Sequence, residues 1–317
     1  MKVAVVIPAF KVSKQIVEVV RAVPKGVSLI IVVDDCCPEG SGEVVREQVT
    51  DARLVVLRNS ENLGVGGAVK RGYEEALSLR AEIVVKLDGD GQMDPTDIDA
   101  LIFPLVSRRA DYSKGNRFDQ LDQLFAMPKI RLIGNAALSL LSKISSGYWS
   151  ITDPTNGFTA ITRQALRKME VAKVSNRYFF ESDMLFRLNL AGAVVQDVSM
   201  PARYGGEKSN LSVGRSVFEF GWKHYVNFNK RIFYRYYLRE WSIASLEWPL
   251  ALLFFAFGAI FGLNALIVSD QTGNPVTAGQ VTLTAMTIIM GMQLFLSFVS
   301  YDVQAEPRDS LQQREPF

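Results

Sequence analysis

Short apolar segments alternate with segments of helical periodicity along the first part of the chain. Four apolar segments, residues 3–7, 29–33, 54–57 and 83–87, are rich in β-branched residues and have the length of buried strands. The segments between them place apolar residues at the spacing of an amphipathic helix. This order predicts an α/β domain with a mostly parallel sheet and helices on both of its faces.

Polar or turn-forming residues follow three of these strands. They are Pro8-Ala9, Asp34-Asp35 and Asp88-Gly89-Asp90. Open parallel sheets bind their ligands beyond the carboxyl ends of the strands. We therefore expect the functional site at these strand ends.

The carboxyl-terminal part of the chain has a different composition. Residues 248–269 are almost all apolar and residues 281–300 form a second uncharged run, so each has the roughly 20 residues that cross a bilayer. Two buried helices of a soluble core are the alternative, but the polar connector between the runs, which contains Gly and Pro, favours the membrane. We predict two transmembrane helices.

Basic residues indicate the orientation of these helices. The connector, residues 270–280, has no Lys or Arg, whereas Arg308 follows the second run and several basic residues precede the first. The preceding residues are Lys223, Lys230, Arg231, Arg235 and Arg239. By the positive-inside rule, we expect both termini and the α/β domain on the cytoplasmic side.

Two further segments mix aromatic and apolar residues with Lys and Arg at helical spacing. Residues 127–149 and 213–241 are typical of helices lying on a membrane surface, with helices of a soluble core as the alternative. His224, the only histidine, is interpreted as an interfacial residue rather than a catalyst.

The expected division of the chain is a catalytic domain (1–212), juxtamembrane amphipathic helices (213–247), two transmembrane helices (248–301) and a cytoplasmic tail (302–317).

Composition excludes some classes of function. The chain has 35 Lys and Arg against 33 Asp and Glu, so it lacks the overall basic field of a nucleic-acid-binding protein. Cys36 and Cys37 are adjacent in sequence, which suits neither an ordinary disulfide nor a zinc site and fits a reducing cytoplasm. Because the apolar amino terminus ends at Pro8, too soon for a signal peptide, we interpret it as the first strand.

The strongest chemical motif is Asp88-Gly89-Asp90, which directly follows a predicted strand. Two carboxylates separated by one glycine can bind one hard cation beside a diphosphate, because oxygen ligands suit Mg²⁺ or Mn²⁺ and glycine permits a close backbone approach. A calcium-binding loop is a poor alternative, because it requires glycine where Met93 stands. An acidic turn without a metal is the remaining alternative.

A glycine-rich segment, residues 62–70, follows another predicted strand and opens a helix. Its backbone N–H groups could contact a nucleotide, but the third glycine of a dinucleotide-binding motif would fall on Val69. A tight helix start with glycine for packing is the alternative. The motif Asp34-Asp35 also has two interpretations, since these residues could bind a nucleobase and ribose or begin a solvated turn.

Together these motifs resemble the inverting family-two glycosyltransferases with the GT-A fold, a Rossmann-like fold, especially the polyprenyl-phosphate branch that is similar to dolichol-phosphate-mannose synthases. The resemblance covers most of the chain. The matching segments are Val6-Ile7-Pro8-Ala9-Phe10, Val33-Asp34-Asp35, Asn62-Leu63-Gly64, Leu87-Asp88-Gly89-Asp90-Gly91-Gln92, Asp153-Pro154-Thr155-Asn156-Gly157-Phe158 and the two predicted membrane helices.

The resemblance implies roles for individual residues. The implied ligands of Mg²⁺ or Mn²⁺ are Asp88, Asp90 and Gln92. The implied nucleotide-sugar-binding residues are Pro8, Ala9, Asp34, Asp35, Gly64, Asp88 and Gly89. The implied binding residues for an acceptor phosphate are Arg117, Arg131, Arg203, Lys208 and Ser209. The implied catalytic residues are Asp90, Glu181 and Asp183.

Two segments depart from the family pattern. In Phe180-Glu181-Ser182-Asp183, a serine separates the two acids that correspond to the family's catalytic base, so either Glu181 or Asp183 could face the sugar. Residues 203–212 keep a basic loop but add an acidic residue, Glu207.

We therefore predict an enzyme that transfers a sugar from a UDP- or GDP-sugar to a polyprenyl phosphate at the cytoplasmic membrane face, as in cell-envelope glycan synthesis. One alternative is an enzyme of the same fold that extends a lipid-linked glycan through a hydroxyl acceptor. A second is a membrane protein that binds sugar nucleotides without catalysis, although the intact Asp88 and Asp90 argue against it. The sequence leaves open the base, the sugar, the lipid and the oligomeric state, with a homo-oligomer among the options.

Overall fold

The computed structural model describes residues 1–119, 129–201 and 213–314, and the side chains of residues 129–132 and 213–217 lie outside this description. The chain divides into two compact units. The first is Met1–Arg231 together with Pro307–Phe317, and the second is Ile232–Glu306. The first unit contains the predicted α/β domain, and the second contains two long apolar helices.

The first unit is built on a seven-stranded sheet with the strand order β3-β2-β1-β4-β6-β5-β7. The strands are β1 (Val3–Ala9), β2 (Leu29–Asp34), β3 (Leu54–Arg58), β4 (Ile83–Lys86), β5 (Tyr112–Asn116), β6 (Thr159–Thr162) and β7 (Val195–Ser199). Neighbouring strands pair in parallel except at β6, which is antiparallel to both β4 and β5. The prediction of a mostly parallel sheet is confirmed, and the four expected strands are β1 to β4.

Alternating side chains of the central strands separate two hydrophobic cores. In β1, Val3, Val5 and Ile7 face one core, whereas Ala4 and Val6 face the other. The first core is covered by α1 (Ile16–Ala22), α2 (Ser41–Gln48) and α4 (Ile98–Val106), and the second by α3 (Val65–Ser78), α7 (Arg163–Lys168) and α8 (Phe180–Ala191). Two short 3₁₀ helices are η1 (Pro95–Asp97) and η2 (Val171–Lys173). Because each fully buried Val or Ile contributes about 1.5–3 kcal/mol, this alternation fixes which side chains face each core.

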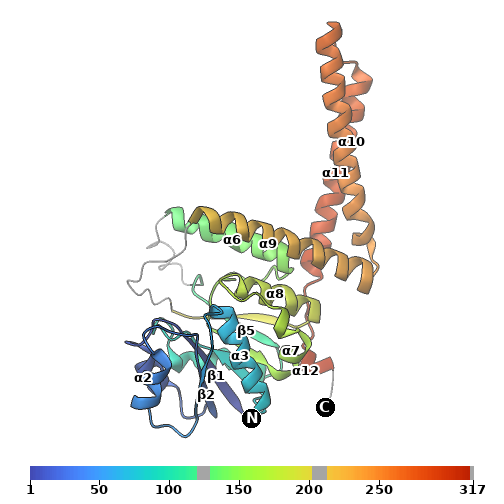
Figure 1. The fold of residues 1–317 in the computed structure, drawn as a ribbon. Helices are drawn as coiled ribbons and strands as arrows, with labels where there is room; N and C mark the ends of the chain where they lie inside the picture. Colours follow the sequence, from blue (N-terminus) through green and yellow to red (C-terminus); the bar gives the residue numbers. More distant parts are fainter. Residues whose placement is uncertain (120–128, 202–212, 315–317) are drawn as a thin grey trace. The chain divides into compact units, whose positions relative to one another are not determined.

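Helices α6 (Lys129–Ser146) and α9 (Val213–Phe233) lie side by side above α8 (Figure 1). Part of their inner face is polar, since Asn227 Nδ2 of α9 donates a hydrogen bond to Asp183 of α8. Their outer face exposes large apolar side chains. These are Ile133, Leu140, Leu141, Phe218, Trp222 and Tyr225. An exposed apolar face of this kind is typical of helices lying on a membrane surface.

His224 belongs to the inner face of α9, so its interpretation as an interfacial residue is wrong. The side chain is buried, with Nδ1 2.7 Å from Ser145 Oγ and the ring in edge-to-face contact with Phe179. Burial lowers the pKa of the His224 imidazole to about 4. His224 is therefore a neutral core residue at physiological pH.

The segment after the second apolar helix returns to the first unit. Helix α12 (Leu311–Arg314) packs beside α7, and Leu311 is buried in the adjoining core. The Asp111 carboxylate accepts hydrogen bonds from the backbone N–H groups of Leu311 and Val194, both at 2.9 Å. Ser310 Oγ donates to the carbonyl oxygen of Arg108 at 2.8 Å. These contacts anchor the segment on the α/β domain.

The second unit is a helical hairpin. It consists of α10 (Ile243–Thr272) and α11 (Ala278–Gln304), preceded by the short π-helix η3 (Tyr234–Arg239). Both long helices have the length and composition to cross a membrane, and they contain the two apolar runs found in the sequence. The sequence prediction of two candidate spans thus agrees with the structure.

Small residues allow the two helices of the hairpin to approach closely. A Cβ on Gly262 of α10 would lie 2.7 Å from the Thr284 side chain of α11. A Cβ on Gly258 would lie 2.8 Å from the side chains of Thr287 and Ile288, which also belong to α11. A polar contact joins the helices near their other ends, where Ser297 Oγ donates to Glu247 Oε1 at 2.6 Å. The partner gives the Glu247 carboxylate a hydrogen bond that an apolar environment would not provide.

Candidate active site

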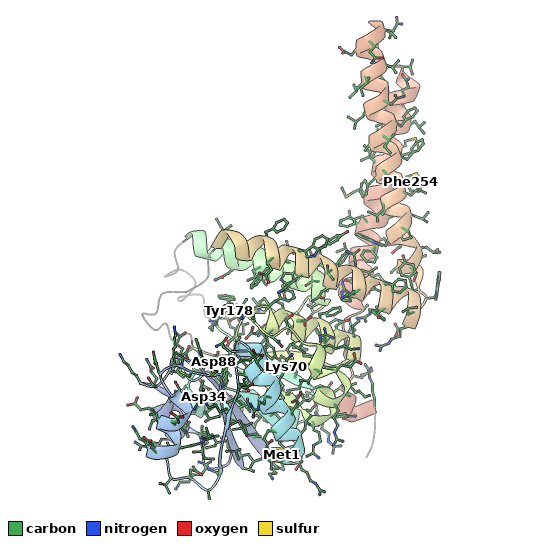
Figure 2. All side chains as sticks on the ribbon, viewed as in Figure 1. Met1, Asp34, Lys70, Asp88, Tyr178 and Phe254 are labelled. Atoms are coloured by element: carbon green, nitrogen blue, oxygen red, sulfur yellow. The ribbon has the colours of Figure 1, made fainter. Side chains whose placement is uncertain are left out.

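A cleft of about 390 Å³ opens at the carboxyl ends of β1, β2 and β4. Figure 2 labels two of its lining residues, Asp88 and Tyr178, at one end of the sheet and Met1 at the opposite end. The predicted donor and metal residues that line the cleft are Pro8, Ala9, Asp35, Gly64, Asp88, Gly89 and Asp90. The structure therefore brings the three predicted strand-end motifs together.

The two aspartates at the end of β2 have different partners, although both are buried. Asp35 lines the cleft, and its two carboxylate oxygens accept hydrogen bonds at 2.9 and 2.7 Å from backbone N–H groups that open the glycine-rich segment. The Asp34 carboxylate instead accepts from the backbone N–H groups of Cys37 and Gly42, both at 2.7 Å. Asp34 thus closes the loop between β2 and α2, while Asp35 faces the space for a ligand.

The glycine-rich segment packs tightly against the loop that precedes α8. Gly64 has a φ of +82°, which an L side chain rarely adopts. A Cβ on Gly66 would lie 2.3 Å from the carbonyl oxygen of Ser175, and the Gly67 N–H donates to the carbonyl oxygen of Asn176 at 3.0 Å. These contacts support the packing alternative for the segment, because several of its N–H groups already bind protein oxygens.

Lys86, the last residue of β4, joins two of the predicted functional carboxylates. Its Nζ is 2.8 Å from Asp88 Oδ1 and 3.3 Å from Glu181 Oε1, and its side chain is only 1% exposed. Burial by itself lowers the pKa of Lys86, but the charges of Asp88 and Glu181 outweigh burial and raise this pKa above its ordinary value. Lys86 is therefore a permanent cation that holds both carboxylates.

Gly157 lies against this ion pair. A Cβ at this position would be 2.4 Å from Lys86 Nζ and 2.6 Å from Asp88 Oδ2, so only glycine fits without displacing them. The carbonyl oxygen of the preceding residue, Asn156, accepts a hydrogen bond from Lys114 Nζ. Burial lowers the pKa of Lys114 to about 8. Asn156 and Gly157 thus contribute to the site through their backbone.

The oxygen donors of the Asp88-Gly89-Asp90 motif fit a divalent cation. Asp88 and Asp90 both line the cleft, and Asp90 Oδ1 accepts a hydrogen bond from the Gln92 backbone N–H at 2.9 Å. Among the described residues, no cluster of three or more His, Cys, Asp or Glu is arranged to hold a metal. Magnesium commonly binds one or two carboxylates together with substrate phosphates and water. The two aspartates therefore suit a metal that arrives with a phosphate ligand.

Asp183 holds a loop together. It is buried, and its Oδ2 accepts hydrogen bonds from the backbone N–H and the Oγ of Ser175 at 2.8 and 3.2 Å. The same oxygen is 3.3 Å from Arg187 Nε, and Oδ1 accepts from Asn227 Nδ2 at 3.2 Å. Of the two acids that the sequence left open, Glu181 is the one that the structure connects to Asp88, through Lys86.

The predicted acceptor residues are only partly described. Arg117 follows β5 and forms an ion pair with the buried Asp153, with Nε–Oδ2 at 2.7 Å and Nη2–Oδ1 at 3.1 Å. Outside the described residues lie the side chain of Arg131 and the whole of Arg203, Lys208 and Ser209. Arg117 is thus the predicted acceptor residue that the structure places, and its guanidinium binds an internal carboxylate.

Sequence reasoning missed several residues of the site. Phe10, Arg177 and Tyr178 line the cleft, and Lys86 holds Asp88. A lysine inside an otherwise apolar strand was an available signal, because burying an ammonium group is costly unless a carboxylate pairs with it. Arg177 gave no such signal, because its loop is far in sequence from the strand-end motifs.

Comparison with known proteins agrees with this geometry. Residues 4–170, more than half of the chain, match the family described as Glycosyl transferase family 2. The chain is 28% identical over 233 residues to the UDP-N-acetylglucosamine--dolichyl-phosphate N-acetylglucosaminyltransferase of Methanococcus voltae, covering 67% of this chain and 92% of that protein. It is 30% identical over 179 residues to the undecaprenyl-phosphate mannosyltransferase of Micrococcus luteus, covering 56% of this chain and 72% of that protein.

The fold is also similar to that of a crystal structure. This is glucosyl-3-phosphoglycerate synthase from Mycobacterium tuberculosis in complex with Mn²⁺, UDP and phosphoglyceric acid, with a TM-score of 0.52 and 17% identity. The match covers 73% of this chain and 78% of that chain. At this identity, the similarity concerns the fold alone.

Proposed function

This chain belongs to glycosyl transferase family 2 and is a glycosyltransferase, and from this premise we propose that it transfers a sugar from a UDP- or GDP-sugar to a polyprenyl phosphate. The observation that carries the proposal is the cleft in which Asp88 and Asp90 face the same space as Asp35. The names of the two relatives, which specify dolichyl phosphate and undecaprenyl phosphate, support this class of acceptor.

The donor would lie across the carboxyl ends of β1, β2 and β4. Asp35 and the backbone at Pro8 would contact the nucleoside, and Asp88, Asp90 and Gln92 would hold Mg²⁺ or Mn²⁺ beside the diphosphate. The bound cation would offset the negative charge that develops on the departing diphosphate. The hydrogen bond from the Gln92 N–H to Asp90 Oδ1 would orient that carboxylate before the ligand binds.

The acceptor phosphate would attack the anomeric carbon on the face opposite the diphosphate. A bond would form between a phosphate oxygen and this carbon while the bond from carbon to the nucleoside diphosphate breaks, with inversion. A phosphate monoester has a second pKa near ~6, so it is already a good oxyanion at neutral pH and requires no base. This chemistry is compatible with Glu181 and Asp183 being engaged by Lys86 and Ser175, respectively.

Membrane attachment would keep the catalytic unit near a lipid acceptor. The hairpin of α10 and α11 provides two candidate spans, and α6 and α9 expose apolar side chains. The chain enters the hairpin from the first unit and, after α11, its last segment is part of that unit again. We therefore propose that both ends of the hairpin lie on the cytoplasmic side, as the basic residues also indicate.

The proposal is tested by product formation with the full chain in detergent or nanodiscs. With a short-chain polyprenyl phosphate and a panel of UDP- and GDP-sugars, mass spectrometry should detect a lipid-phosphate sugar, and EDTA should abolish its formation. The matching polyprenol, which lacks the phosphate, is the control acceptor. A product on a lipid-linked glycan but none on the lipid phosphate would replace this proposal with glycan extension.

A further inference from the structure

The loop before α8 is held rigidly against the donor cleft. Ser175 is bound through its N–H and Oγ to Asp183, and the Asn176 carbonyl oxygen accepts the Gly67 N–H of α3 at 3.0 Å. On the other side, the Arg177 carbonyl oxygen accepts the Phe180 N–H at 2.9 Å. The protein thus uses a buried carboxylate and a helix start to fix the position of a short exposed segment.

Glycine brings this loop into the cleft wall. A Cβ on Gly64 would lie 2.8 Å from the carbonyl oxygen of Asn176 and 3.0 Å from Cγ of Arg177, so the absence of a side chain permits the contact. The aliphatic stem of Arg177 therefore packs on Gly64, and Arg177 and Tyr178 line the same cleft as Asp88 and Asp90.

Arg177 is the cationic side chain among the described residues that line this cleft. Within the described parts of the chain, its guanidinium forms no hydrogen bond or ion pair, and the residue is exposed. Lys86 and Arg117 differ from Arg177 in that they form ion pairs within the protein. Lys86 pairs with Asp88 and Glu181, and Arg117 pairs with Asp153. A guanidinium fixed on a rigid loop at the cleft wall is suited to bidentate contact with phosphate oxygens.

The charge of the cleft supports the same conclusion. Asp35, Asp88 and Asp90 contribute carboxylates to its wall, and a nucleoside diphosphate or a lipid phosphate would add further negative charge. A protein cation facing this ligand would reduce the repulsion. We propose that Arg177 binds phosphate oxygens of a ligand in this cleft, with Asp183 as the residue that positions its loop; the proposal rests on the function proposed above.

Substitutions can separate the charge of Arg177 from its packing. Arg177→Met keeps an aliphatic stem over Gly64 but removes the guanidinium, and Arg177→Lys keeps a charge but loses the bidentate geometry. Lys173→Met is the matched control, because it removes one exposed charge from the same segment, where Lys173 pairs with Glu170. Binding of UDP, GDP and their nucleosides to the full chain is measured by calorimetry, with and without Mn²⁺.

Arg177→Met should weaken UDP or GDP binding roughly ten- to a hundredfold without changing nucleoside binding, because a charge-assisted hydrogen bond is lost. Arg177→Lys should recover part of the affinity, and Lys173→Met should match the wild type. If nucleotide binding is unchanged but the KM for polyprenyl phosphate rises by a similar factor, the phosphate that Arg177 binds is that of the acceptor.

Two results would overturn the inference. One is wild-type nucleotide binding and acceptor KM in Arg177→Met, and the other is an equal loss of nucleoside and nucleotide binding, which would indicate packing alone. Failure of the proposed function looks different. In that case the wild-type chain would still bind UDP or GDP through Arg177 but would form no lipid-phosphate sugar.

Discussion

The two sides of the active site use their charged residues in different ways. On the proposed donor side, formed by the carboxyl ends of β1, β2 and β4, Asp35, Asp88 and Asp90 line an open cleft. On the proposed acceptor side, formed by the end of β5, residues 153–158 and the start of α8, charged residues pair within the protein. The pairs are Arg117 with Asp153 and Asp183 with Arg187.

This difference teaches that an acidic motif alone does not identify a catalytic group. Asp88 and Asp183 both belong to motifs that resemble those of glycosyltransferases. Asp88 lines the cleft, whereas Asp183 accepts hydrogen bonds from Ser175 and Asn227. A carboxylate that does not line the cleft and whose oxygens bind protein donors contributes mainly to the shape of the site. Tertiary packing decides whether such a carboxylate lines the cleft or lies against hydrogen-bond donors of the protein, and this separates the two roles.

The largest expected effect is that of Asp90→Asn on the donor side. Removal of one carboxylate from the candidate metal site should lower kcat/KM by roughly a hundredfold or more, because a metal ion contributes several kcal/mol to transition-state stabilisation. Initial rates are measured over a Mn²⁺ titration. Asp99→Asn, an exposed aspartate in the first turn of α4, is the control and should behave like the wild type. Full activity of Asp90→Asn would contradict the proposed role of Asp90 as a metal ligand.

On the acceptor side, Asp183→Asn should act on stability. The change removes a buried charge from the partners Ser175 and Arg187, which should lower the free energy of unfolding by about 3 kcal/mol. Denaturant unfolding of the full chain and transfer at low temperature, where the variant remains folded, are compared. A variant with wild-type stability and no transfer would show that Asp183 is the base, and the contrast between the two sides would fail.

Glu181→Gln serves as the companion substitution. It leaves Lys86 with Asp88 as its remaining carboxylate partner, so we expect a lower kcat with a smaller loss of stability than Asp183→Asn. The kcat and the unfolding midpoint of both variants are measured together. The reverse ranking would exchange the roles of the two acids.

Gly157→Ala tests the connection between the two sides, because Gly157 lies against Lys86, which pairs with both Asp88 and Glu181. The added methyl would overlap Lys86 Nζ and Asp88 Oδ2, which should cost about 1–3 kcal/mol of stability and reduce affinity for Mn²⁺. Gly26→Ala is the control, because a Cβ there would meet no atom within 4 Å. Equal behaviour of the two alanine variants would contradict this packing.

The last expected effect concerns pH and His224 of α9. The pKa of His224 is lowered from 6.5 to about 4 in the folded protein, so the unfolded chain binds more protons between these values and stability should rise with pH across this window. The rise attributable to His224 is at most roughly 3 kcal/mol. Unfolding of the wild type and of His224→Phe is compared from pH 4 to 6.5.

A second group provides an internal check on this comparison. Burial raises the pKa of Asp197 to about 6, so its contribution to stability should fall as pH rises from about 4 to 6. Because Asp197 is present in both proteins, its effect cancels in the difference between wild type and His224→Phe. An identical pH dependence in the two proteins would show that His224 is not buried as a neutral group.

Local sequence pattern was sufficient for much of this protein. The four parallel strands, the two long apolar helices and the strand-end motifs could be predicted, because burial of alternating or continuous apolar residues depends on near neighbours in the chain. Asp88 and Asp90 were also recognisable, since they directly follow a buried strand and therefore must lie at its end.

Only the tertiary structure decided which charged residues line the cleft. The antiparallel insertion of β6 brings Gly157 against Lys86. The loop before α8 packs on the start of α3, which places Ser175 beside Asp183 and Arg177 at the cleft. These contacts join residues far apart in the chain, so no local periodicity encodes them. The physical reason is that a buried charge must find its partner wherever the fold supplies one, and one sequence pattern can therefore lead either to a ligand or to an internal hydrogen bond.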